Sequence, residues 1–159
     1  MREAAPGLWI GDDADAAALL TAHPRGNSWR IVHAAREPWH RKFLGYRGRF
    51  APDDSPDYLC AFRDWEGLRR VLAPRARRLA LNLIDDPHPT PAPAEILGRT
   101  IWWIRMLRAA QVPVLVQCNA GLSRAPTLAL TALLDQAPWN DIPFWELEER
   151  WREHVGGAF

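Results

Sequence analysis

The sequence is poor in cysteine, in net charge and in long apolar runs. It contains two cysteines in 159 residues, Cys60 and Cys118, which are too few for a disulfide framework or a cysteine-based zinc site. No apolar run is long enough to cross a bilayer, and residues 1–7 contain no apolar signal region. A net charge of +1 argues against nucleic acid or a membrane surface as partner. We therefore expect a cytoplasmic protein whose thiols stay reduced.

The length and the pattern of the chain predict one α/β domain over residues 1–159. Short apolar stretches alternate with helical patterns, which is typical of a mostly parallel central sheet flanked by helices. Strands are expected over residues 9–10, 29–34, 79–84 and 112–116. Helices are expected over residues 14–20, 64–72, 94–110, 127–134 and 142–154.

One segment carries most of the chemistry, namely the stretch from Val114 to Pro126. Three apolar residues predict a buried strand, Cys118 follows, and Arg124 comes six positions later, just before a buried helix. A strand, a tight loop and a helix N-terminus together build an anion site, because loop amides and the helix dipole favour negative charge. That field favours the thiolate of Cys118, and Arg124 can bind two phosphate oxygens at once.

A simpler interpretation is that the cysteine and the arginine are a chance pair. A buried cysteine is usually a small apolar side chain with no chemical role. Here, however, the pair comes with Gly121 in the loop, Ser123 beside the arginine, a strand before and a helix after. This context favours a phosphate-binding loop with a cysteine nucleophile.

The loop resembles that of the cysteine-dependent protein tyrosine phosphatases, and most closely the dual-specificity group, in a small bacterial or phage type. Those proteins carry His-Cys-x-x-Gly-x-Ser-Arg followed by Ser or Thr. Weaker similarities lie at Gly7–Gly11, Ile31–Ala35 and Leu81–Asp85. The resemblance implies a phosphatase that needs no metal or cofactor, with Cys118 as nucleophile and Arg124 as phosphate ligand. It also implies that the loop residues bind the phosphate, namely Asn119, Ala120, Gly121, Leu122 and Ser123.

Two loop positions depart from the family pattern. Gln117 replaces the family histidine before the nucleophile, which helps to hold the loop and to favour the thiolate. Ala125 replaces the hydroxyl residue after the arginine, which in the family stabilises the thiolate when the phosphoenzyme is hydrolysed. We expect the second departure to slow the second chemical step more than the first.

Two adjacent carboxylates are candidates for the general acid that protonates the leaving oxygen. Asp85 and Asp86 follow an apolar strand and open a proline-rich loop, which has few conformers and suits the presentation of a side chain. The resemblance favours Asp85, and the spacing to Cys118 permits Asp86. In the simpler interpretation both aspartates are turn residues.

The sequence leaves the substrate open. The expected partner is a phosphorylated protein, carrying phosphotyrosine or also phosphoserine and phosphothreonine, or a small phosphoester such as an inositol, a sugar or an RNA 5′ end. Aromatic and basic residues mix over 36–57, which suggests either substrate recognition or a solvated loop. A pseudophosphatase that binds a phosphorylated partner without hydrolysis is the alternative, motivated by Gln117 and Ala125. Cys60 is either structural or the partner of a reversible disulfide with Cys118, and the oligomeric state stays open.

Overall fold

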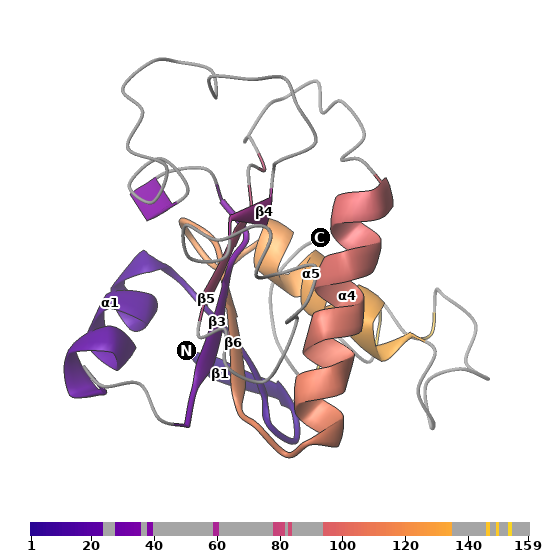
Figure 1. The fold of residues 1–159 in the computed structure, drawn as a ribbon, viewed down its shortest axis with the longest axis horizontal. Helices are drawn as coiled ribbons and strands as arrows, with labels where there is room; N and C mark the ends of the chain where they lie inside the picture. The colour runs from indigo at the N-terminus through magenta and orange to yellow at the C-terminus, as the bar shows by residue number, and fades with distance from the viewer. Residues whose placement is uncertain are drawn as a thin grey trace.

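A mixed sheet forms the centre of the protein (Figure 1). The computed structural model describes residues 1–23, 28–35, 38–39, 59–60, 78–81, 83 and 94–134, together with Glu146, Glu149 and Glu153. Within these residues the sheet has six strands in the order β1-β2-β6-β3-β5-β4. They are β1 (Arg2–Ala5), β2 (Leu8–Gly11), β3 (Arg30–His33), β4 (Leu59–Cys60), β5 (Arg78–Leu81) and β6 (Val114–Gln117). The four inner strands are parallel and the two edge strands antiparallel, which confirms the predicted α/β fold with a mostly parallel sheet.

Helices cover both faces of this sheet. Figure 1 shows α1 (Asp13–Ala22) on one side, and α4 (Ala94–Ala109) and α5 (Arg124–Leu133) on the other. Strand β6 shows why both faces need cover, because all four of its side chains are buried. Val114 and Val116 join the apolar cluster under α4 and α5, whereas Leu115 joins the smaller cluster under α1. The side chains alternate between the two layers, as they must in an extended strand.

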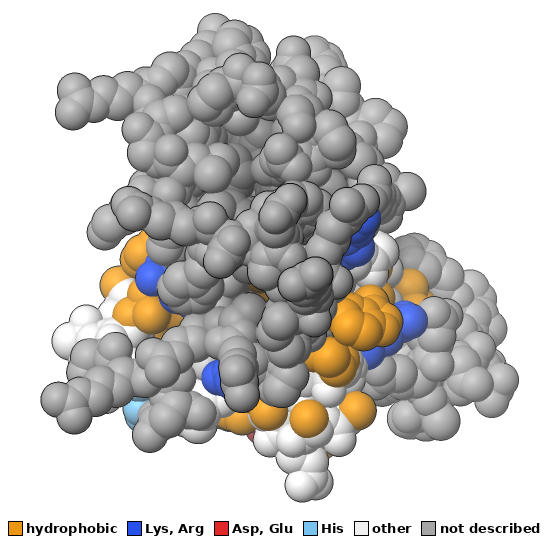
Figure 2. Space-filling model, viewed as in Figure 1, with side chains coloured by type: hydrophobic (Ala, Val, Ile, Leu, Met, Phe, Trp, Pro, Cys, Tyr) orange, Lys and Arg blue, Asp and Glu red, His pale blue; other side chains and the backbone are white. Residues whose placement is uncertain are grey.

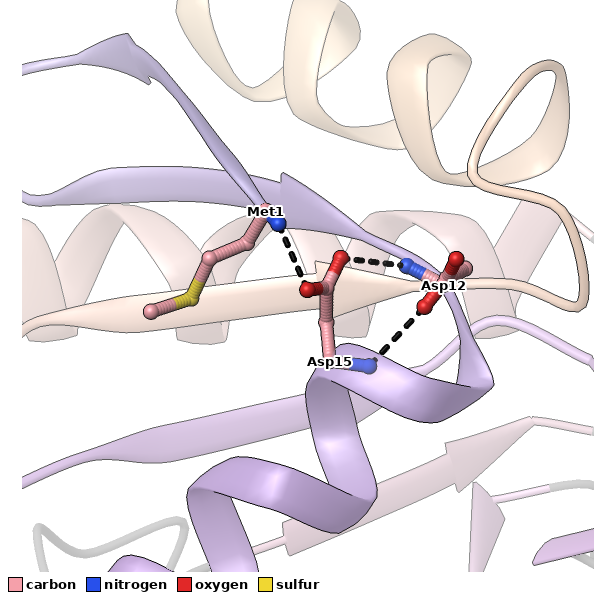
Figure 3. Close-up of polar contacts among 3 residues, drawn as sticks. All are labelled: Met1, Asp12 and Asp15. Atoms are coloured by element: carbon pink, nitrogen blue, oxygen red, sulfur yellow. Dashed lines mark hydrogen bonds and ion pairs between the residues drawn. The ribbon is translucent and has the colours of Figure 1, made fainter.

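Helix α1 begins with a complete capping box (Figure 3). The Asp15 amide donates to Asp12 Oδ1 at 2.9 Å, and the Asp12 amide donates to Asp15 Oδ2 at 3.2 Å. The amino group of Met1 lies 2.6 Å from the other oxygen of Asp15. Burial opposes ionisation of Asp15, but this ion pair and the backbone hydrogen bonds outweigh it and lower its pKa. The start of α1 is thereby fixed directly after the end of β2.

The boundaries of several elements differ from those expected. Strand β5 stops at Leu81, three residues early, and β6 is shifted toward the loop so that it ends at Gln117. Helix α5 starts at Arg124, three residues before the expected start. The edge strands β1 and β4 were not predicted at all, since neither has a clear apolar alternation. The helix expected over 64–72 lies outside the described residues, and of 142–154 only Glu146, Glu149 and Glu153 are described, all helical.

Charged and apolar side chains are interspersed on the face of the molecule seen in Figure 2. Arg side chains appear there at separate places among hydrophobic ones. Among the described residues, three large apolar side chains are about half exposed, namely Met1 at 51%, Trp102 on α4 at 51% and Leu122 in the cysteine loop at 55%. Across the ranges described above, no helix is long and apolar enough to cross a membrane.

Candidate active site

Cys118 lies where three parallel strands end together. It follows β6 directly and is 3% exposed. Its amide donates to the Gly11 carbonyl at the end of β2 at 3.3 Å, and the Ala34 amide, just after β3, donates to the Gln117 carbonyl at 2.7 Å. The carboxyl edge of a parallel sheet is the usual place for a binding site in α/β proteins. The backbone that leaves β6 is therefore held from both sides at the position of the cysteine.

The loop after Cys118 closes tightly against β2. Gly121 has a φ of +69°, and a Cβ atom there would come within 2.9 Å of the Gly11 carbonyl oxygen. Gly11 is equally constrained, because a Cβ atom there would lie 2.8 Å from Asp15 Oδ2. A guanidinium nitrogen of Arg2 on β1 donates to the Gly121 carbonyl at 3.3 Å. Only glycine allows this approach, so the sequence around Gly121 dictates the loop's shape.

The loop presents polar and exposed residues over a buried base. Asn119, Ala120, Leu122 and Ser123 are exposed, while Ala125 and Pro126 behind them are fully buried. Ser123 is the N-cap of α5, and its hydroxyl makes no capping hydrogen bond. The helix therefore begins without a side-chain cap and turns its positive dipole end to the loop, which favours an anion there.

Arg124 connects the loop to the segment that follows β5. Its guanidinium donates to the Leu83 carbonyl at 2.8 Å and lies 3.4 Å from Asn119 Oδ1. The side chain is half-buried at the first position of α5. Arginine has five donors in a planar fork that matches an oxyanion, and these contacts orient that fork at the start of α5.

The candidate acids lie outside the described residues. Neither Asp85 nor Asp86 is described, and of the segment 36–57 only Pro38 and Trp39 are. Leu83, two residues before Asp85, is the described residue nearest to them in sequence on the β5 side.

Asp13 is a carboxylate near the site whose position the sequence did not reveal. The Trp39 indole N–H donates to its Oδ1 at 3.2 Å. Burial raises its pKa, and the charge of Arg124 acts in the opposite direction. Asp13 thus lies close enough to Arg124, the candidate phosphate-binding residue, for the arginine charge to oppose the rise of its pKa.

A buried polar chain lies behind the loop, on the face of the sheet that α1 covers. The Gln117 side-chain amide contacts His33 Nδ1 at 2.7 Å, and Arg78 Nε donates to His33 Nε2 at 3.1 Å. Burial, reinforced by the Arg78 charge, holds the pKa of His33 well below its usual range, so the imidazole is neutral at pH 7. Burial also lowers the pKa of Arg78 to about 10. His33 ends β3 in register with Gln117, and this pairing brings the two side chains together.

Comparison with solved structures finds chains of similar fold. The Cydia pomonella PTP-2 phosphatase is similar at 16% identity and a TM-score of 0.59, over 98% of this chain and 80% of that chain. A human tyrosine phosphatase-like serine/threonine/tyrosine-interacting protein is similar at 19% identity and a TM-score of 0.59, over 98% and 83%. Tk-PTP in its active form is similar at 18% identity and a TM-score of 0.51, over 95% and 80%. The chain has the fold of the protein tyrosine phosphatases. No protein-family profile and no curated protein sequence matches it.

Within this phosphatase fold the two cysteines lie on well-separated strands. Cys60 is in register with Ala80, Ala80 with His33 and His33 with Gln117, so three strand spacings separate β4 from β6. At about 4.8 Å a strand this is about 14 Å, twice the Cα separation that a disulfide tolerates. The sheet therefore excludes a disulfide between Cys60 and Cys118 in this conformation. In the described part of the chain, no three His, Cys, Asp or Glu side chains gather as a potential metal site.

Proposed function

We propose that the protein is a phosphatase that hydrolyses phosphate monoesters through a cysteinyl-phosphate intermediate. One arrangement carries the proposal: buried Cys118 and Arg124 lie at the two ends of a glycine-closed loop that leads into a helix N-terminus. The loop from Asn119 to Arg124 holds the phosphate, and the fold is that of the protein tyrosine phosphatases. The enzyme class that we propose is a protein tyrosine or dual-specificity phosphatase.

The proposed reaction has two steps. The Cys118 sulfur forms a bond to phosphorus while the bond from phosphorus to the leaving oxygen breaks, and Asp85 gives that oxygen its proton. The Asp85 carboxylate then takes a proton from water, whose oxygen attacks phosphorus as the sulfur–phosphorus bond breaks. The products are inorganic phosphate and the free thiolate. Arg124, the loop amides and the Ser123 hydroxyl stabilise the charge on the equatorial oxygens in both transition states.

The contact of Arg124 with Leu83 supports an acid from this segment. Asp85 is joined to Leu83 through one intervening residue, so the two Cα atoms are at most about 7 Å apart. The Leu83 carbonyl accepts a hydrogen bond from Arg124 at 2.8 Å. This contact supports the choice of Asp85 as the acid, with Asp86 one residue farther along the chain.

The exposed rim of the loop is compatible with both proposed classes of substrate. A phosphate on a protein side chain or on a small phosphoester can enter over Asn119 and Leu122.

We propose that residues 1–159 form one phosphatase domain, in keeping with likeness to solved structures over 98% of the chain. The proposed compartment is the cytoplasm, because the nucleophile must stay reduced.

The role of Cys118 as nucleophile is tested with the other cysteine, Cys60, as control. We expect Cys118→Ser to abolish turnover of para-nitrophenyl phosphate, and Cys60→Ser to retain it, since β4 lies three strands away from β6. Vanadate, an analogue of the pentacoordinate phosphorus, should inhibit the wild type and the Cys60 variant alike. Normal turnover by Cys118→Ser would disprove the mechanism.

The acid is tested by comparing the two adjacent aspartates. Asp85→Asn should lower kcat for an alkyl phosphate about 100-fold, the usual contribution of general acid catalysis. Asp86→Asn should lower it far less. If Asp86→Asn proves the more damaging change, the acid assignment moves by one residue while Cys118 keeps its role.

A binding module is the second candidate. Gln117 and Ala125 depart from the phosphatase pattern, and one similar structure is named as phosphatase-like and as an interacting protein. An early burst of product followed by slow turnover supports an enzyme with a slow second step. Absence of burst and turnover on phosphopeptides, inositol phosphates and nucleotides, with measurable tungstate binding, supports the binding module instead.

A further inference from the structure

The polar chain behind the loop has a defined direction of hydrogen bonding. A guanidinium can only donate, so His33 Nε2, which faces Arg78 Nε at 3.1 Å, must accept. A neutral imidazole that accepts at Nε2 carries its proton on Nδ1. The Gln117 atom that lies 2.7 Å from Nδ1 must then be an acceptor, namely Oε1.

The other amide orientation sets two donors against each other. With Nε2 of Gln117 toward His33, its N–H meets the proton on Nδ1 at a separation of 2.7 Å between the nitrogens, and neither group accepts. Rotating the amide by 180° pairs the oxygen with the proton on Nδ1 and occupies the same space. The chain then runs from Arg78 to Nε2, and from Nδ1 to Gln117.

Further contacts hold the imidazole in this position. The Trp39 ring stacks on His33 with centroids 4.7 Å apart, and Arg78 lies over the same tryptophan at 4.8 Å. The Trp39 indole is in turn anchored on Asp13. His33 is fully buried and thus has one orientation in which to present its Nδ1 proton.

We propose that His33 is a positioning residue for Cys118 and acts through Gln117. Gln117 is the last residue of β6 and the neighbour of the nucleophile, so a fixed Gln117 side chain fixes the backbone from which Cys118 and the loop depart. The family pattern has a histidine at the position of Gln117. In this chain the imidazole comes from β3 instead, one strand away and in register. The inference rests on the proposed function.

Three variants and a control test the proposal. His33→Phe keeps a ring to stack on Trp39 but removes both nitrogens, and Gln117→Met keeps the length of the side chain but removes the amide. The third variant combines the two. Ile31→Val is the control, because Ile31 is buried on the same strand and the same face but belongs to the apolar cluster under α1. Turnover of para-nitrophenyl phosphate and alkylation of Cys118 by iodoacetamide are measured on each folded variant.

We expect each single variant to lower kcat about tenfold with KM changed less than twofold, since a small displacement of the nucleophile affects the transition state more than binding. The double variant should lose about tenfold rather than 100-fold, because both changes break the same connection. Cys118 alkylation should slow in parallel, and Ile31→Val should change neither rate.

The outcomes separate this inference from the proposed function. Unchanged kcat and alkylation in folded His33→Phe overturn the role of His33, while an inactive Cys118→Ser keeps the phosphatase. Multiplicative losses in the double variant also overturn it. If Cys118→Ser retains turnover, the phosphatase falls, and alkylation alone decides whether His33 positions the thiol. If His33→Phe does not fold, Gln117→Met decides: unchanged rates overturn the proposal and slower alkylation supports it.

Discussion

At the scale of single residues, the two unusual loop positions differ in kind. The Gln117 side chain has a hydrogen-bond partner, because its amide contacts the imidazole of His33 on the neighbouring strand β3. Ala125 is not compensated in this way: it is fully buried in the apolar cluster under α4 and α5. The missing hydroxyl is therefore the departure that should be visible in the kinetics.

Restoring that hydroxyl should speed the second step. We expect Ala125→Ser to raise the steady-state rate about tenfold, the lower end of what a hydrogen bond to a charged group contributes. The rate constant of the initial burst should change far less than the steady-state rate, because the first step does not depend on the hydroxyl. Rapid-quench measurement with an aryl phosphate checks this, and an equal change in both phases would contradict it.

Gly121 provides a second prediction at this scale, with Gly7 as its control. Both have positive φ, but a Cβ atom at Gly7 meets nothing within 4 Å, whereas at Gly121 it meets the Gly11 backbone. Gly7→Ala should cost about 1 kcal/mol of backbone strain and leave turnover unchanged. Gly121→Ala should cost more than this and abolish turnover, since the loop must move away from β2. Denaturant unfolding and kcat measure both, and equal effects of the two variants would refute the close approach.

At the scale of elements, the start of α1 supports the loop from below. Asp12 follows Gly11, whose carbonyl accepts from Cys118, and it begins the capping box shown in Figure 3. Asp12→Ala removes the acceptor for the Asp15 amide and should lower the free energy of unfolding by about 1 kcal/mol. Asp12→Asn keeps a side-chain acceptor and should lie close to wild type. Denaturant titrations compare the two variants, and equal losses would show that charge rather than capping is responsible.

Elements were predictable where local signals are strong. The apolar spacing in 94–110 and the aspartates before 14–20 gave α4 and α1 almost to the residue, because helix periodicity and capping are local. Strand β6 and the loop also followed from local chemistry. Edge strands β1 and β4 did not, since their formation depends on pairing with β2 and β5.

The contacts around the site could not be predicted from the sequence, for a different reason. His33 and Gln117 are 84 positions apart and meet only because β3 and β6 pair in parallel with one particular register. Nothing local to either residue specifies the order of the strands. The sequence therefore indicated Cys118 and Arg124 as candidates through one contiguous loop, but treated Gln117 as an isolated departure.

At the scale of the whole molecule, folding places a titratable ring in the interior. His33 is fully buried and contacts Trp39, Arg78 and Gln117. Burial holds its pKa in the folded state well below 6.5. In the unfolded chain the ring is in water and titrates near 6.5. Below that pH the unfolded state binds a proton that the folded state excludes, so acid favours unfolding.

The free energy of unfolding should therefore fall as the pH drops below about 6.5, by up to about 1.4 kcal/mol per pH unit for this one group. Urea titrations between pH 5.5 and 7.5 measure the slope. In this window His33→Phe should flatten it, because the variant has no ring to protonate. His23→Asn is the matched control, because it removes a histidine that is not part of the hydrogen-bonded chain of Arg78, His33 and Gln117. An identical slope in wild type and His33→Phe would mean that His33 is not the group that senses acid.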